Sequence, residues 1–241
     1  MRKTNSRNQI CCIIIILSCV LILLMMMSAG KRPKTVVREL RTPYRLNETA
    51  MERSEEVKNL SNEYICFTNE ATTCSDLDEE DKARITEILE SLIDKGMSRY
   101  DKIKAVHDWI VKNMAYDKSL QKRSAKDMLR YGKAVCKGYA ELFKEFMDRL
   151  EIPCIYIVGY STKSEKSDVC HVWNACQMED GLWYYVDCCW DDPVKNGSSD
   201  YKDGSNLSYD NFLIGAESLA KKHIPCFMPQ PEAESDYRPT N

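Results

Sequence analysis

Residues 132–143 read GKAVCKGYAELF and place one cysteine, Cys136, where a loop passes into a helix. Beyond it, apolar side chains recur at three- and four-residue steps, which predicts a helix with one buried stripe. The stripe consists of Tyr139, Ala140, Phe143, Phe146, Met147 and Leu150. Cys136 lies one turn before the first members of this stripe, so we expect its thiol to face whatever the helix packs on.

Helical spacing also marks the chain before this stretch. Apolar residues predict one helix from about residue 79 and a second whose apolar face includes Ile103 and Ile110. Ser124 is followed three residues later by Asp127, which is the pattern of a capping box at the start of a short helix. Helices therefore dominate the first half of the predicted domain.

Beyond Pro153 the pattern changes from helices to strands. Residues 154–159 form a short, apolar and β-branched segment. Residues 171–177 and 182–189 are separated by a turn-like Met-Glu-Asp-Gly, which predicts an antiparallel hairpin. Helices first and strands afterwards predict an α+β fold.

The composition describes one globular domain with extensions. The chain has 241 residues, of which 44% are hydrophobic and 29% charged, and this length suffices for one buried core but is short for two. The chain has 34 basic and 37 acidic side chains. Three of the basic ones, Arg2, Lys3 and Arg7, lie at the N-terminus, so the rest of the chain has 31 basic and 37 acidic side chains. The resulting acidic balance argues against a nucleic-acid partner. The oligomeric state is left open.

The N-terminus carries a targeting pattern. A polar, basic start is followed by residues 10–27, which contain no charged side chain. Since this run is close to the length needed to span a bilayer, we expect a retained membrane anchor. A signal peptide cleaved near Ser28 or Gly30 is the alternative.

The predicted organisation has four parts. Residues 1–30 are the anchor or signal segment, 31–62 a charged stalk, 63–228 the folded domain and 229–241 a flexible tail. A single span near the N-terminus predicts a membrane-anchored protein with its domain outside the cytoplasm, or a secreted one if the segment is cleaved.

A nucleophilic cysteine needs a base, and the base needs a group that orients it. A helix N-terminus lowers the pKa of a thiol, which favours Cys136 as the nucleophile. The chain offers His107, His171 and His223 as bases. His107 lies near an apolar helix face and His223 near the end of a short helix, and both positions are typical of structural histidines. This leaves His171 as the candidate base.

The register of the predicted hairpin decides whether His171 meets an acidic partner. A three-residue loop over 179–181 places Asp187 opposite Trp173 and diagonal to His171 on the same face. A two-residue turn places Asp187 opposite Asn174 and puts the pair on opposite faces. A Cys–His–Asp triad therefore requires the longer loop.

Two alternatives were weighed against the triad. Buried free cysteines are common, so Cys136 by itself is better explained as a structural thiol. A zinc site drawn from Cys170, His171, Cys188 and Cys189 conflicts with strand geometry, because adjacent strand residues point to opposite faces. We predict no metal and no cofactor.

Three motifs resemble those of the transglutaminase-like superfamily, in the same order. They are Cys136 in GKAVCKGYA, His171 in HVWN and Asp187 in WYYVDCCWDDP, and the resemblance extends over roughly residues 80–225. It implies a papain-like arrangement in which N-terminal helices precede a cysteine-bearing helix that packs on an antiparallel sheet. Cys189 departs from the family, whose members commonly have threonine at this position.

The resemblance also implies a reaction. Cys136 would attack an amide carbonyl, His171 would transfer the proton to the leaving amine, and Asp187 would orient the imidazole. The Cys136 backbone N–H and, more weakly, Tyr116 would stabilise the oxyanion. We expect a membrane-tethered, exported cysteine enzyme that hydrolyses or transfers peptide or protein amides. The alternative is an inactive binding module for peptides or cell-surface polymers.

Overall fold

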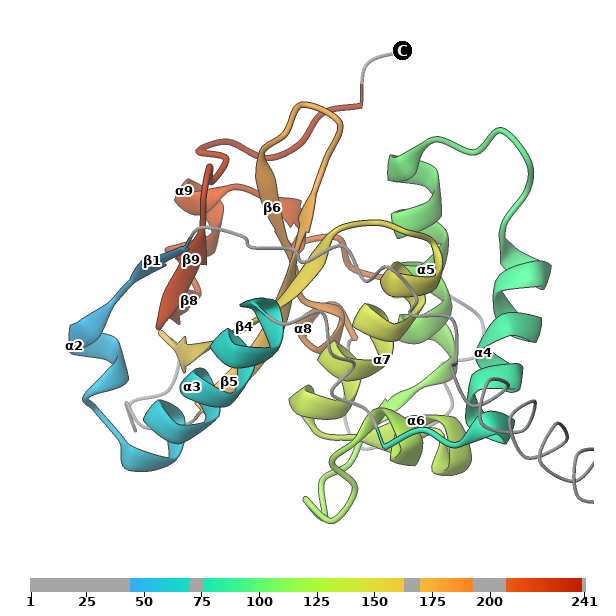
Figure 1. Ribbon diagram of the computed structural model, residues 1–241, viewed down its shortest axis with the longest axis horizontal. Coiled ribbons are helices and arrows are strands. Elements are labelled where there is room, and N and C mark those ends of the chain that lie inside the picture. The colour runs from blue at the N-terminus through green and yellow to red at the C-terminus, as the bar shows by residue number, and fades with distance from the viewer. Residues whose placement is uncertain (1–43, 70–75, 163–169, 193–206, 240–241) are drawn as a thin grey trace, which may run out of the picture. The chain divides into compact units, whose positions relative to one another are not determined.

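The computed structural model describes residues 44–69, 76–162, 170–192 and 207–239, without the side chains of 63–69. It combines helices with an antiparallel sheet and confirms the predicted α+β class (Figure 1). The helices are α2 (Glu48–Met51), α3 (Glu55–Asn69), α4 (Glu79–Leu92), α5 (Arg99–Asn113), α6 (Ala125–Tyr131), α7 (Cys136–Arg149), α8 (Cys188–Asp191) and α9 (Ala216–Leu219).

The main sheet is antiparallel and has the strand order β7-β6-β5-β4-β8. Its strands are β4 (Cys154–Ser161), β5 (Cys170–Gln177), β6 (Trp183–Val186), β7 (Phe212–Ile214) and β8 (His223–Pro225). Two small pairings accompany it. They are the antiparallel β1 (Tyr44–Leu46) with β9 (Phe227–Pro229), and the parallel β2 (Ala115–Tyr116) with β3 (Lys133–Ala134).

Helix α7 lies between the sheet and the other helices. It contacts β4 and β5 on one side and α4, α5 and α6 on the other. Every residue from Gly138 to Met147 is buried, including Glu141, Lys144 and Glu145. The predicted apolar stripe is therefore part of a helix that is enclosed on nearly all sides, and its polar residues are accommodated by ion pairs such as Lys144–Asp148 at 2.6 Å.

Gly138 lets the first turn of α7 approach the chain before α6. A Cβ at this position would overlap the Ala134 side chain and lie 2.9 Å from the Ser124 carbonyl oxygen. Ser124 also begins α6 through the predicted capping box with Asp127. The close approach holds the N-terminal end of α7, and with it Cys136, against the helical layer.

The hairpin between β5 and β6 has the three-residue loop that the triad requires. Gln177 pairs with Trp183 and Asn174 with Val186, and Gly181 takes the positive φ of +81° that favours glycine. Continuing this register places Asp187 opposite Trp173, as predicted. Strand β6 ends before Asp187, however, because this residue caps α8.

The predicted stalk and tail include folded segments. Ala50 and Val57, within the supposed stalk, are buried, and α3 lies against β4. In the supposed tail, the Ala233 N–H donates to the Trp183 carbonyl and the Tyr237 N–H to that of Leu213, at 3.0 and 2.9 Å. These segments are polar overall, and a few apolar anchors and backbone hydrogen bonds hold them to the fold.

The predicted membrane-anchored localisation is corrected. None of the helices in the described part of the chain is long and apolar enough to cross a bilayer. The segment on which the prediction rested, residues 10–27, lies outside the described residues.

Candidate active site

Cys136 is the first residue of α7 and is half-buried. The residue before it, Val135, donates its N–H to the Lys122 carbonyl at 2.9 Å, which ties the start of the helix to the preceding loop. The His171 imidazole and the Val172 backbone N–H lie close enough to the Cys136 thiol to lower its pKa. The structure thus brings the predicted nucleophile and base together.

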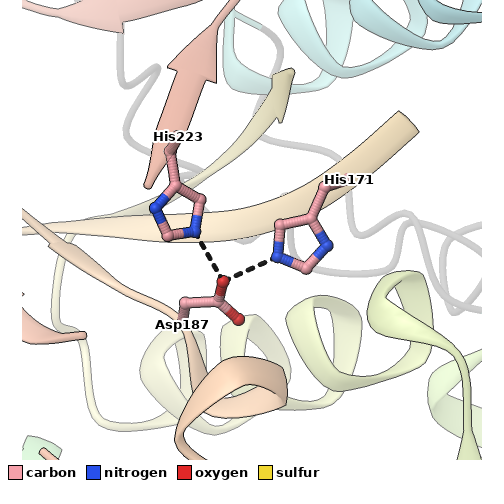
Figure 2. A group of neighbouring side chains, drawn as sticks. All are labelled: His171, Asp187 and His223. Atoms are coloured by element: carbon pink, nitrogen blue, oxygen red, sulfur yellow. Dashed lines mark hydrogen bonds and ion pairs between the residues drawn. The ribbon is translucent and has the colours of Figure 1, made fainter. Parts of the chain in front are cut away.

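His171 is the second residue of β5 and is only 5% exposed. Its Nε2 lies 2.6 Å from Asp187 Oδ2 (Figure 2), which leaves Nδ1 for the thiol. The ring stacks on Trp190 and Trp173, with centroids 4.9 and 5.6 Å away. Aromatic packing and the carboxylate together fix the plane of the imidazole.

Asp187 lies between β6 and α8 and is 3% exposed. Its Oδ1 accepts a hydrogen bond from the Trp190 N–H at 3.1 Å, while its own N–H donates to the Asn211 carbonyl at 2.9 Å. Oδ2 accepts from His171 and from a second histidine, His223, at 2.8 Å. Both carboxylate oxygens are therefore held in place.

The pKa shifts of the thiol and the imidazole favour an ion pair. Burial raises the pKa of Cys136, but the hydrogen bond and charge of His171 outweigh it, so the pKa is lowered. Burial lowers the pKa of His171, but the charge and hydrogen bond of Asp187, aided by Cys136, raise it to about 10. Burial raises the pKa of Asp187, but His171 and His223 hold it well below its usual range. The imidazolium and the carboxylate are therefore favoured at neutral pH, and the imidazolium makes the Cys136 thiolate easier to form.

Tyr116, the predicted second oxyanion donor, lies in β2 and is half-buried. Burial raises the pKa of its phenol to about 12, and the nearby thiols of Cys136 and Cys189 add to this shift in their ionised forms. The hydroxyl therefore keeps its proton at neutral pH and can donate a hydrogen bond near the nucleophile. Its role in the reaction stays a prediction.

His223 is the site residue that sequence reasoning misplaced. We expected it to interact with the end of a short helix, but α9 ends at Leu219 and His223 begins β8 instead. Its ring packs against Trp190 and Trp173, with centroids 4.3 and 4.7 Å away. His223 lies in the segment KKHIP, and nothing in the local sequence pattern indicated that this segment forms a strand paired with β4.

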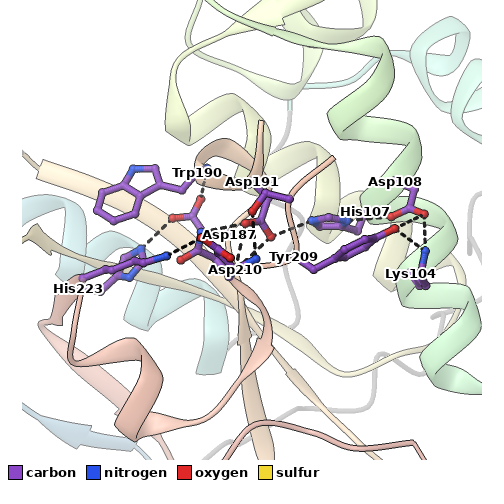
Figure 3. Close-up of polar contacts among 12 residues, drawn as sticks. Lys104, His107, Asp108, Asp187, Trp190, Asp191, Tyr209, Asp210 and His223 are labelled. Atoms are coloured by element: carbon purple, nitrogen blue, oxygen red, sulfur yellow. Dashed lines mark hydrogen bonds and ion pairs between the residues drawn. The ribbon is translucent and has the colours of Figure 1, made fainter. Parts of the chain in front are cut away.

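His107 belongs to a series of polar contacts that also includes Asp191, Asp187 and His223 (Figure 3). It is fully buried in α5, and its Nδ1 and Nε2 lie 3.1 Å from Asp108 and Asp191 respectively. Asp191 also accepts hydrogen bonds from the backbone and side chain of Asn211. This network fastens α8 to α5, which is a structural role of the kind expected for His107.

His171, Asp187 and His223 form the one metal-capable group within the described ranges. Their donor atoms lie within 4.8 Å of one another. Both Nε2 atoms converge on Asp187 Oδ2 at hydrogen-bond distance, so this oxygen occupies the point where a cation would sit. Cys188 and Cys189, two of the four residues considered for a zinc site, lie in α8 rather than in a strand, so the expected strand geometry does not apply to them.

The other thiols near the site differ from Cys136. Burial raises the pKa of Cys170 to about 12, and it raises the pKa of Cys189 well above the usual value, with negative neighbours adding to both shifts. Both are free thiols. At neutral pH they stay protonated, so the departure from threonine at Cys189 adds no second thiolate.

Comparison with known proteins shows which family and which proteins part of this chain resembles. Residues 86–188 match the transglutaminase-like superfamily. Kyphoscoliosis peptidase of Mus musculus is 30% identical and that of Homo sapiens 29% identical over 122 residues. Each match covers 45% of this chain and 18% of the relative, so the chain corresponds to a minor part of those proteins.

Two solved structures share a more distant likeness. A TGase is 19% identical over 58% of this chain and 41% of its own, with a TM-score of 0.42. A candidate cysteine protease of Cytophaga hutchinsonii is 16% identical over 81% of this chain and 64% of its own, with a TM-score of 0.44. The region that is similar to the transglutaminase-like superfamily, residues 86–188, contains Cys136, His171 and Asp187.

Proposed function

We propose that this domain is a cysteine enzyme that acts on peptide or protein amides through Cys136, His171 and Asp187. The observation that carries the proposal is the arrangement of the three groups, in which the His171 imidazole interacts with the Cys136 thiol and its Nε2 lies 2.6 Å from the Asp187 carboxylate. The name of the kyphoscoliosis peptidases supports hydrolysis, and the family name supports transfer to an amine.

The proposed reaction begins with the Cys136 thiolate. Its sulfur forms a bond to the amide carbonyl carbon, and the carbonyl oxygen becomes an oxyanion near the Cys136 N–H and the Tyr116 hydroxyl. The His171 imidazolium then gives its proton to the leaving amine as the carbon–nitrogen bond breaks. Water or an amine attacks the resulting thioester while His171 takes a proton, and the thiolate leaves with the imidazolium restored.

The second candidate function is an inactive module that binds peptides in the same place. It is favoured by the limited access to the site, since His171 and Asp187 are 5% and 3% exposed. Cys136 is half-buried rather than enclosed. The reactivity of this thiol decides between the two functions.

The test is the pH dependence of Cys136 alkylation in the full chain, followed thiol by thiol by mass spectrometry. Because His171 lowers the pKa of Cys136, we expect labelling at pH 6–7 to be about tenfold faster than for an ordinary thiol of pKa about 8.5. The labelling rate falls as the pH drops through the lowered pKa of Cys136 and the thiolate is protonated.

His171→Ala is the matched variant, and Cys170 in the same sample is the internal reference thiol. We expect His171→Ala to remove the advantage of Cys136 while Cys170 labels slowly throughout. A fluorogenic peptide amide then reports turnover, with and without an added primary amine. Labelling of Cys136 no faster than an ordinary thiol, unchanged in His171→Ala, would establish the binding module instead.

A further inference from the structure

We infer that His223 is a positioning residue of the proposed enzyme, which holds Asp187 in the orientation that His171 requires. The inference rests on the proposed function and adds a fourth side chain to the triad. Its basis is that one carboxylate oxygen, Asp187 Oδ2, accepts hydrogen bonds from two imidazoles (Figure 2).

The Asp187 carboxylate is held at both ends. Oδ1 accepts from the Trp190 N–H at 3.1 Å, and Oδ2 accepts from His223 at 2.8 Å and from His171 at 2.6 Å. With Trp190 alone, the carboxylate could rotate about its Oδ1 contact and move Oδ2 away from His171. The hydrogen bond from His223 opposes that rotation.

His223 is itself placed by the close approach of two strands. On β4, Gly159 pairs with Pro225 and Ser161 with His223. A Cβ at Gly159 would lie 2.7 Å from the Trp173 ring and 2.9 Å from the Pro225 Cα. The absence of a side chain at Gly159 therefore lets β8 and Trp173 pack together and brings the His223 ring into the site.

The charges around His223 keep it neutral. Burial and the charge of His171 lower its pKa, and Lys222 adds to this, although Asp187 acts in the opposite direction. Because Nε2 of His223 faces the carboxylate oxygen, the neutral imidazole carries its proton on Nε2. Nδ1 is then unprotonated, in agreement with its buried position without a hydrogen-bond partner. His223 thus donates one hydrogen bond and adds no second cation beside His171.

This arrangement predicts how the site responds when the donor is lost. An Asp187 carboxylate that is free to rotate stabilises the His171 imidazolium less, so the pKa of His171 falls and the thiolate of Cys136 forms at higher pH. A hydrogen bond to a charged group contributes enough to change an equilibrium by about tenfold. We therefore expect each of the two pKa values to move by about one unit.

The experiment compares His223→Leu, which fills similar space without a donor, with His223→Gln, whose amide donates but does not titrate. For each full-chain variant, the pH profile of Cys136 alkylation and the NMR titration of the His171 ring are measured beside thermal unfolding. We expect His223→Leu to label about tenfold more slowly at pH 6 and to lower the pKa of His171 by about one unit. His223→Gln should stay close to the unchanged protein on both readouts.

Two outcomes would overturn the inference. The first is a His171 titration in His223→Leu that matches the unchanged protein, whatever happens to the melting temperature. The second is equal impairment of the Leu and Gln variants, which would mean that the imidazole ring matters only for packing. The His171 titration does not depend on turnover, so a slow Cys136 in the unchanged protein would count against the proposed enzyme and not against His223.

Discussion

In the described part of the domain, two buried aspartates, Asp187 and Asp191, each pair with histidine, and the two sites differ in the surroundings of the nearby thiol. His171 Nε2 lies 2.6 Å from Asp187, and His107 Nε2 lies 3.1 Å from Asp191. The two aspartates are four residues apart, at the two ends of α8. A buried histidine–aspartate contact is therefore not by itself a sign of catalysis in this chain.

The thiols beside the two pairs respond in opposite directions. His171 lowers the pKa of Cys136 through a hydrogen bond and its charge, against the effect of burial. Burial raises the pKa of Cys188 well above its usual value, and the charges of Asp191 and Asp187 raise it further. A thiol that faces an imidazolium is activated, whereas one that faces carboxylates is kept protonated.

The largest expected effect is the difference between two variants in which one of the two cysteines is replaced by alanine. Cys136→Ala removes the proposed nucleophile, so we expect the rate of peptide-amide cleavage to fall by about a thousandfold or more. Cys188→Ala removes a thiol that is never charged, and cleavage should stay within about threefold of the original rate. Turnover of a fluorogenic peptide amide measures both. A comparable loss of cleavage rate in the two variants would mean that the two thiols do not differ in the way proposed.

The next effect separates the two aspartates. Asp187→Asn should lower the rate of amide cleavage by about 10³–10⁴-fold, because an amide at this position cannot stabilise the imidazolium. Asp191→Asn should instead lower the free energy of unfolding by about 2–4 kcal/mol, because His107 loses a charged, buried partner.

Urea unfolding and turnover at a temperature where both variants are folded provide the measurement. We expect Asp187→Asn to lower mainly the turnover rate and Asp191→Asn to lower mainly the free energy of unfolding. A variant Asp191→Asn that is fully stable but inactive would show that the α5–α8 network takes part in the reaction.

The smallest effect concerns Tyr116, which lies near the thiol of the first pair. Tyr116→Phe removes a neutral donor and should lower kcat/KM for amide cleavage by about tenfold, since the Cys136 N–H remains. The alkylation rate of Cys136 should not change, because that reaction forms no oxyanion. Equal turnover in Tyr116→Phe and the unchanged protein would remove Tyr116 from the site.

Several features of the site followed from local sequence alone. The Ser124–Asp127 capping box, the start of a helix near Cys136 and the loop at Gly181 are each specified by a few adjacent residues. Such signals are short-range, because capping and positive φ depend on backbone geometry within one turn. The hairpin register depends on the loop length, which the sequence left open between two and three residues, and the structure has the longer loop that brings His171 and Asp187 together.

Long-range pairings were not accessible in the same way. His223 is 36 residues from Asp187 and reaches it only because β8 pairs with β4. The segment 229–239 is polar and was expected to be a flexible tail, yet Trp183 donates its backbone N–H to the Pro231 carbonyl at 3.0 Å. Backbone groups that pair across a fold leave no pattern in side-chain hydropathy.

The sequence by itself determined the α+β class, the helix that begins at Cys136 and the hairpin that joins His171 to Asp187. These depend on spacing, capping and turn chemistry, which act between near neighbours. The tertiary structure decided which partners each histidine has: it placed His107 beside Asp191 and added His223 to the Asp187 carboxylate. The physical reason is that the pKa of a buried group depends on the charges and donors that folding brings to it from distant parts of the chain.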